Sequence, residues 1–268
     1  MSETPGPAEV EALVGVDQVA ADRFVGRPEH RGGAGGLFGG QTIAFTVRAA
    51  GGTVEPAFVP YSVYADLLRP GDSGEPLELV VERTRDGSSI VHRRVQGVQA
   101  GKLIVEAIVV ACRQVDTIDW QRDDAHAPIV DVVGPGPSPT AGDVSRFGHG
   151  VFDVRHVGEP ETIHPLWVRS LVALPDDPWL HASIVAFWSD FGPNWATRAV
   201  VGRFEQRPTL SLNHALWFHR VARTEDWHLF DVRPRSVVGR QGLAMASLLS
   251  PEGALVASVA QGVFVGGA

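Results

Sequence analysis

The 268-residue sequence has little cysteine, no long apolar run and no excess of basic charge. Its single cysteine, Cys112, cannot form a disulfide within the chain, which favours a reducing compartment. Because Cys112 lies in an apolar stretch, we interpret it as a core residue rather than a nucleophile. The formal net charge of −8 argues against nucleic acid or an anionic membrane as the main partner.

The apolar segments are too short to cross a bilayer. The longest covers residues 103–112 and is interrupted by Glu106, whereas a membrane helix needs about 20 apolar residues. The first residues show no basic segment followed by an apolar one, so we expect no signal peptide. These features predict a cytoplasmic protein. Hydrophobic residues make up 44% of the chain, which is enough to bury a substantial core.

The first part of the chain predicts one helix packed on an antiparallel sheet. Residues 1 to about 30 are a polar lead-in with one short amphipathic segment, and a glycine-rich stretch (residues 31–40) then leads into a helix-like stretch (residues 41–50). Four β-rich segments with short turns between them follow the helix, as in an antiparallel sheet. The expected strands cover residues 56–68, 76–84, 88–99 and 102–115.

A proline- and glycine-rich segment precedes a second stretch of similar content. Its composition is typical of a linker. We therefore expect an N-terminal module over residues 1–125, a linker over residues 126–147 and a C-terminal module over residues 148–268. The C-terminal module has a helix-like stretch at residues 181–190, and its expected strands cover residues 151–157, 165–174, 210–220, 227–240, 242–250 and 254–265.

The two modules align as an internal repeat. Residues 43–45 match residues 185–187, 142 positions later, and residues 103–105 match residues 255–257, 152 positions later. Between these two matches, Tyr64 falls near His214 at a spacing of 150. A slowly increasing spacing is what a duplicated module with small loop insertions produces.

The repeat distributes two chemical features unequally. Gly39 and Gly40 precede the first helix, and a glycine-rich loop at a helix start can present free backbone amides. The alternative is a flexible turn that allows close helix packing. The second helix ends at Asp190, whereas the aligned residue of the first helix is Arg48. If the modules pack face to face, the amides and Asp190 form one composite site per chain, and the symmetry-related position has neither.

Three polar residues of the C-terminal module lie in apolar surroundings: Asp190, Ser211 and Gln261. A buried carboxylate or amide needs a hydrogen-bond partner or a role, although each residue taken alone could face solvent. As a set they suit activation of a water molecule, with the aspartate as general base and the other two as orienting groups. Backbone amides at Gly39 and Gly40 could hold a developing oxyanion, as in hydrolysis of an activated acyl group.

Other chemistries fit the sequence less well. His214 and His219 are five residues apart on a predicted strand, so they point to opposite faces, and no clustered ligand motif suggests a metal. The chain contains no G-x-S-x-G motif and no P-loop lysine. His92, Arg93 and Arg94 could meet phosphates, but exposed strand positions are the simpler interpretation.

The sequence resembles the type II acyl-CoA thioesterases from about residue 38 to residue 261. The resemblance is carried by FGGQ (residues 38–41), RDGSS (85–89), AFWSD (186–190), NHALWFHR (213–220) and GALVASVAQG (253–262). It implies an α+β double-hotdog fold, in which two tandem modules each wrap an antiparallel sheet around a long helix.

The resemblance also implies a catalytic set of Asp190, Ser211 and Gln261, acting on an acyl-CoA without a metal or an organic cofactor. By analogy it suggests a homodimer or homotetramer, and it gives no reason to expect a nucleic-acid or membrane partner. The chain departs from the family at Asn213, where an aspartate is usual. It also departs after Gln261, where the family usually continues with Glu-Gly and ends on an arginine, and this chain has Gly262, Val263 and Phe264.

Two other functions remain open from the sequence. A non-catalytic acyl-CoA-binding protein could keep the same fold. A hotdog enoyl-CoA hydratase would need a catalytic Asp–His pair within a Gly-Asp-x-Asn-Pro-type motif, and the sequence has no such motif.

Overall fold

The computed structural model describes residues 6–28, 36–115, 118–122, 150–156, 165–202 and 207–266. The expected linker over residues 126–147 lies outside the described residues. The N-terminal module contains α1 (Pro7–Val14), β1 (Val16–Ala20), β2 (Arg23–Gly26), α2 (Gly39–Gly51), β3 (Phe58–Leu67), β4 (Leu77–Asp86), β5 (Ile90–Gln99) and β6 (Lys102–Arg113).

The C-terminal module likewise has two helices and six strands. Its elements are β7 (Phe152–His156), β8 (Leu166–Ser170), α3 (Pro178–Trp188), α4 (Pro193–Val201), β9 (Thr209–Phe218), β10 (His228–Val238), β11 (Gln241–Leu249) and β12 (Leu255–Val265).

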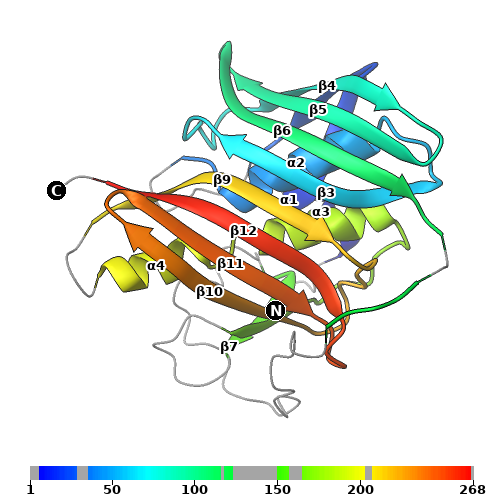
Figure 1. Ribbon diagram of the computed structural model, residues 1–268. Helices are drawn as coiled ribbons and strands as arrows, with labels where there is room; N and C mark the ends of the chain where they lie inside the picture. The colour runs from blue at the N-terminus through cyan, green and yellow to red at the C-terminus, as the bar shows by residue number, and fades with distance from the viewer. Residues whose placement is uncertain are drawn as a thin grey trace, which may run out of the picture.

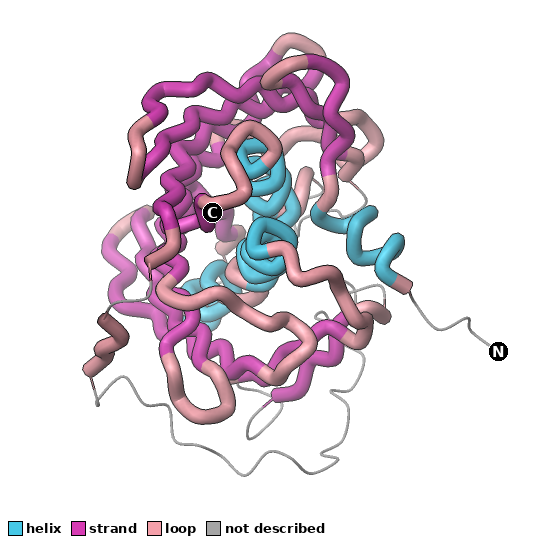
Figure 2. The backbone as a smooth tube through the Cα atoms, turned by 90° about the vertical axis from the view of Figure 1, so that its right-hand side faces the viewer, coloured by secondary structure: helices cyan, strands magenta, loops and turns pink. Residues whose placement is uncertain are grey.

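All twelve strands of the described chain join one antiparallel sheet in the order β1-β2-β4-β5-β6-β3-β9-β12-β11-β10-β8-β7. The order is symmetric about the pair β3 and β9, which joins the two modules at the centre (Figure 1). The sheet curves around the helices, and α2 and α3 lie side by side within it (Figure 2). This is the double-hotdog arrangement that the resemblance implied.

Local sequence explains where the second long helix begins. Asp177 caps α3, because its carboxylate accepts a hydrogen bond of 2.9 Å from the Trp179 backbone N–H. Pro178 occupies the first helical position, where its missing N–H costs nothing. Every residue of α3 after Pro178 is buried. An apolar helix of this kind needs cover on all sides, which α2 and the sheet supply.

Two arginines confirm the repeat and refine its spacing. The Arg69 guanidinium donates a hydrogen bond of 2.6 Å to the Leu103 carbonyl, and Arg220 donates one of 2.6 Å to the Leu255 carbonyl. The spacing is therefore 151 residues at the ends of β3 and β9, and 152 residues at the starts of β6 and β12, as expected for the latter.

The expected match between Tyr64 and His214 is wrong by one residue. Tyr64 is 46% exposed on the outer face of β3, whereas His214 is fully buried on β9. Because side chains alternate between the faces of a strand, a shift of one residue exchanges inside and outside. The residue that corresponds to His214 is Val63, which is also buried.

The N-terminal lead-in was the largest omission of the sequence interpretation. Residues from Pro7 to Gly26 form α1 and the hairpin β1–β2, and β2 pairs with β4 at the edge of the sheet. Helix α4 was also not expected. Among the described residues, no helix has the length and hydropathy that a membrane span requires.

Candidate active site

Asp190 lies where the two long helices meet. Helix α3 ends at Trp188, and Ser189 and Asp190 continue it by less than one turn. The Asp190 carboxylate then faces the start of α2, where its Oδ2 accepts a hydrogen bond of 3.0 Å from the Gly40 N–H. The structure thus brings Asp190 to the glycine-rich helix start from which 150 residues separate it in sequence.

Both glycines at this helix start are required by the close approach. A Cβ atom at Gly39 would lie 2.6 Å from Asp190 Oδ2, and one at Gly40 would lie 2.4 Å from the Phe187 carbonyl oxygen. Within the part of the chain that the structure describes, the Gly39 N–H donates no hydrogen bond, and Gly39 lines the pocket beside Asp190. Gly40 therefore holds the carboxylate, while the amide of Gly39 is available to a ligand.

A β-bulge turns Ser211 toward this site. In the pairing of β9 with β12, Gly262 lies opposite Asn213 and Val263 lies opposite Ser211, so Leu212 is an extra residue. The extra residue reverses the alternation of side chains, and Ser211 therefore faces the same side as His214 although they are three residues apart. Nothing in the sequence around Leu212 indicates this bulge.

Gln261 links Ser211 to the carboxylate. Its side chain is fully buried on β12, and its Nε2 donates a hydrogen bond of 2.7 Å to Ser211 Oγ. The same amide also hydrogen-bonds to Asp190. The five residues singled out in the sequence, from both helices and two strands, therefore meet in one place.

Burial raises the pKa of the Asp190 carboxyl from 3.8 to about 7. The cause is loss of hydration of the charged form, which the hydrogen bonds from Gln261 and the Gly40 backbone oppose but do not overcome. A carboxyl with a pKa close to neutrality can take up and release a proton at physiological pH, as a general base must.

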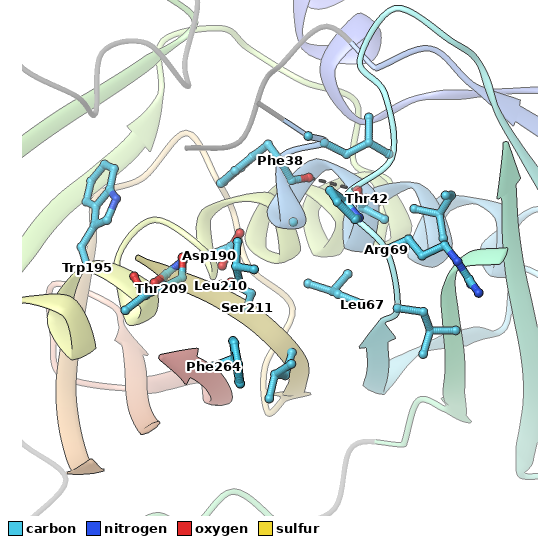
Figure 3. Close-up of a pocket in the computed structure, with 18 residues that line it drawn as sticks. Phe38, Thr42, Leu67, Arg69, Asp190, Trp195, Thr209, Leu210, Ser211 and Phe264 are labelled. Carbon is cyan, nitrogen blue, oxygen red and sulfur yellow. Dashed lines mark hydrogen bonds between the residues drawn. The ribbon is translucent and has the colours of Figure 1, made fainter. Parts of the chain in front are cut away.

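A pocket of about 270 Å³ opens beside Asp190 (Figure 3). Asp190 and Ser211 contribute oxygen atoms to its wall, and Arg69 is its basic residue. Most of the remaining wall is apolar and comes from both modules. These apolar side chains are Leu37, Phe38, Leu67, Leu68, Ile104, Trp195, Leu210, Leu212 and Phe264.

The position related to Asp190 by the internal symmetry carries different chemistry. Arg48, near the end of α2, forms an ion pair of 2.9 Å with Asp177 at the start of α3. His181 and Ala182 stand where the first module has its two glycines. A second pocket of about 500 Å³ lies beside the start of α3; Asp119 is its acidic lining residue, and no glycine of the described chain lines it.

The structure revises the interpretation of several other residues. Arg93 is 2% exposed and donates hydrogen bonds to Thr53 and Asp86, so it is a buried structural arginine rather than an exposed strand residue. Cys112 is half-buried on β6, and burial raises the pKa of its thiol. No group of ligating side chains that could hold a metal ion occurs among the described residues.

The departure at Asn213 lies on the outer face of β9, where its Oδ1 accepts a hydrogen bond of 3.2 Å from the Gly262 N–H. A Cβ atom at Gly262 would lie 2.5 Å from this oxygen. The two departures from the family pattern, at Asn213 and Gly262, are therefore in contact with each other. Phe264, another of the changed positions, lines the pocket.

Comparison with known proteins identifies the family. The model of the acyl-CoA thioesterase N-terminal domain matches residues 27–137, and that of the acyl-CoA thioesterase C-terminal domain matches residues 111–265. The chain belongs to the acyl-CoA thioesterase family. The match to the C-terminal domain alone covers more than half of the sequence.

Relatives of this thioesterase are similar over nearly their whole length. Acyl-coenzyme A thioesterase 8 of Rattus norvegicus is 24% identical over 281 residues, covering 94% of this chain and 87% of the relative. The crystal structure of an acyl-CoA thioesterase II from Mycobacterium marinum has a TM-score of 0.77 at 29% identity, with 96% and 97% of the two chains covered. A hotdog-fold protein from Alicyclobacillus acidocaldarius has a TM-score of 0.76 at 17% identity, covering 97% and 98%, and shares the fold.

Proposed function

We propose that this thioesterase hydrolyses acyl-CoA to a free fatty acid and CoA by means of a water molecule activated by Asp190. The observation that carries the proposal is the position of the Asp190 carboxylate, which lies beside the Gly39 N–H and beside the side chains of Ser211 and Gln261. Its pKa of about 7 matches the task of a general base at neutral pH.

The first step joins the water oxygen to the thioester carbonyl carbon. Asp190 accepts one proton of the water as the new C–O bond forms, and the carbonyl electrons move to its oxygen. The Gly39 N–H, at the positive end of the α2 dipole, is the donor that can stabilise this oxyanion. Ser211 and Gln261 orient the water, because both polar groups lie beside Asp190.

The second step breaks the C–S bond. The oxyanion re-forms the carbonyl, and the CoA sulfur leaves as a thiolate that receives the proton from Asp190. The fatty acid then ionises in water. Every bond and proton is accounted for by the chain and one water molecule, so this sequence of steps requires no cofactor.

The pocket gives the acyl group and the CoA separate surroundings. The apolar side chains that line it suit an acyl chain, because their burial excludes water from hydrocarbon. Arg69 is exposed at the same pocket and can meet a phosphate of CoA. We propose an acyl-CoA substrate on this basis.

The remaining expectations stay part of the proposal. Two modules joined by a linker over residues 126–147 agree with the internal repeat, and a cytoplasmic location agrees with the single cysteine. Assembly into a homodimer or homotetramer rests on analogy with other hotdog proteins.

The test is CoA thiol release from acyl-CoAs of graded chain length, with Asp190→Asn as the control. We expect the wild type to release CoA faster than the variant by about 10²- to 10⁴-fold for at least one length. Equal release for every length would refute the proposal. Tight binding without turnover would instead identify a non-catalytic acyl-CoA-binding protein, and hydration of crotonyl-CoA would identify a hydratase.

A further inference from the structure

A chain of hydrogen-bonded polar side chains runs inward from Ser211 and Gln261, and its two inner members, His214 and Ser189, have no part in the mechanism above. His214 is fully buried, and its Nε2 lies 2.8 Å from Ser189 Oγ. Its Nδ1 lies 2.7 Å from Gln261 Oε1, while Gln261 Nε2 donates to Ser211 Oγ at 2.7 Å. Neither His214 nor Ser189 lines the pocket.

The fold itself does not require these polar groups. The first module has a corresponding helix and two corresponding strands. His214 and Gln261 lie directly opposite each other on neighbouring strands of the second module, and their counterparts lie directly opposite each other in the first. All three counterparts of the buried polar residues in the first module are buried valines. They are Val47, Val63 and Val109.

Burying Ser189, His214 and Gln261 in place of three valines destabilises the fold unless each polar group is hydrogen-bonded. The first module shows that an apolar core works at these positions. The second module carries the polar version on the side where Asp190 lies, so the polar groups serve the site rather than the fold.

The hydrogen bonds also indicate which ring nitrogen of His214 carries the proton. Burial lowers the pKa of His214 to about 4, so the imidazole is neutral at pH 7 and has one donor and one acceptor. Gln261 presents its carbonyl oxygen to His214, which requires the proton on Nδ1. Nε2 is then an acceptor 2.8 Å from Ser189 Oγ, and the Ser189 hydroxyl, which donates to the Ala186 carbonyl at 2.7 Å, shares its one proton between these two acceptors.

The opposite tautomer would turn the Gln261 amide over. Gln261 would then present an oxygen, not an NH₂ group, toward Ser211 and Asp190. Two oxygen acceptors would face each other, and the carboxylate would lose a donor. With the Nδ1–H tautomer, Ser211 accepts from Gln261 and its own proton is free to donate to the water.

We propose that His214 is a positioning residue, whose Nδ1–H donates to Gln261 Oε1 so that Gln261 directs its NH₂ group toward Ser211 and Asp190. The proposal rests on the hydrolysis proposed above for the roles of Gln261 and Ser211. His214 touches neither the substrate nor the water. It acts by fixing which end of one amide faces the site.

The direct test is the tautomer of His214 in the wild-type protein, measured by ¹⁵N NMR of the histidine-labelled chain. The His214 signal is identified by its loss in His214→Asn. We expect the proton on Nδ1 at neutral pH, and a proton on Nε2 would overturn the proposal. This measurement does not depend on catalysis, so it stands even if no acyl-CoA is hydrolysed.

Kinetics supply a second test. His214→Val, which copies the first module, should lower kcat about 10- to 100-fold with little change in KM, as loss of a supporting residue does in other sites. His214→Asn keeps an N–H near the Nδ1 position and should recover most of the rate. His219→Val, at an exposed histidine five residues away, is the matched control and should keep the wild-type rate.

A double mutant separates positioning from general damage to the fold. In a Gln261→Leu background, His214→Val should cause no further loss of kcat, because there is no amide left to orient. An equal loss with and without Gln261 would contradict the proposal. If His214→Val does not fold, the tautomer and the Asn variant decide the question.

Discussion

Replacing Asp190 by asparagine should stabilise the folded protein at and above neutral pH while removing its activity. The wild-type carboxyl has its pKa raised from 3.8 to about 7 by burial. Between these values the folded state holds a proton that the unfolded state has released. Stability therefore falls as the pH rises through this window, and it does not depend on this group below about pH 3.8.

The size of the effect follows from the shift. Each pKa unit corresponds to about 1.4 kcal/mol. Asp190 therefore destabilises the folded wild type by about 2 kcal/mol at pH 5, where the folded state must keep the carboxyl protonated, and by about 4 kcal/mol at pH 8, where it must bury the charge. Because the carboxylate lines an open pocket, water screens part of the charge, and these values are upper limits. Asparagine has the same shape and carries no charge, so it avoids this cost.

The assay is denaturant unfolding of both proteins near pH 5 and pH 8. The advantage of Asp190→Asn over the wild type should grow by up to about 3 kcal/mol between the two conditions, which corresponds to roughly 6–12 °C in Tm. Asp17→Asn is the control, because the Asp17 side chain is 64% exposed. A stability difference that is the same at both pH values would refute the argument from burial.

Three further results are expected. Gly39→Ala keeps the backbone N–H but should lower kcat about 10²-fold, as a misplacement of about 1 Å can, because its Cβ atom would push Asp190 Oδ2 aside; a wild-type kcat would show that this contact is unimportant. Asp190→Asn should bind one acyl-CoA per chain in a calorimetric titration, and a second equivalent would assign a ligand to the second pocket, beside Ala182. Arg69→Met should raise KM for acyl-CoA more than for the matching acyl-pantetheine, and an equal change for both would rule out a phosphate contact.

The sequence predicted the fold where hydrophobic pattern and repetition were strong. Strands such as β6, with long runs of alternating burial, were found within a few residues of their bounds, and the second helix likewise. The hairpin β1–β2 was missed because its strands are only five and four residues long, and its place at the sheet edge depends on pairing with β4. Pairing between distant segments has no local signal.

The internal repeat also allowed most of the candidate site to be predicted from the sequence, but not all of its geometry. The repeat showed that Asp190 and the two glycines occur once each, which pointed to a composite site. It could not show the bulge at Leu212, without which Ser211 would face away. It also aligned His214 with an exposed tyrosine instead of Val63, and thereby hid the buried polar chain.

The measurement that tests the central claim most directly is the pH dependence of CoA release by the wild type and by Asp190→Asn. If Asp190 is the general base, kcat/KM of the wild type rises tenfold per pH unit below about pH 7 and then levels off, because only the ionised carboxyl can accept the proton of water. Asp190→Asn should lack this rise and remain about 10²- to 10⁴-fold slower. A variant that keeps the wild-type rate or the same pH profile would contradict the account.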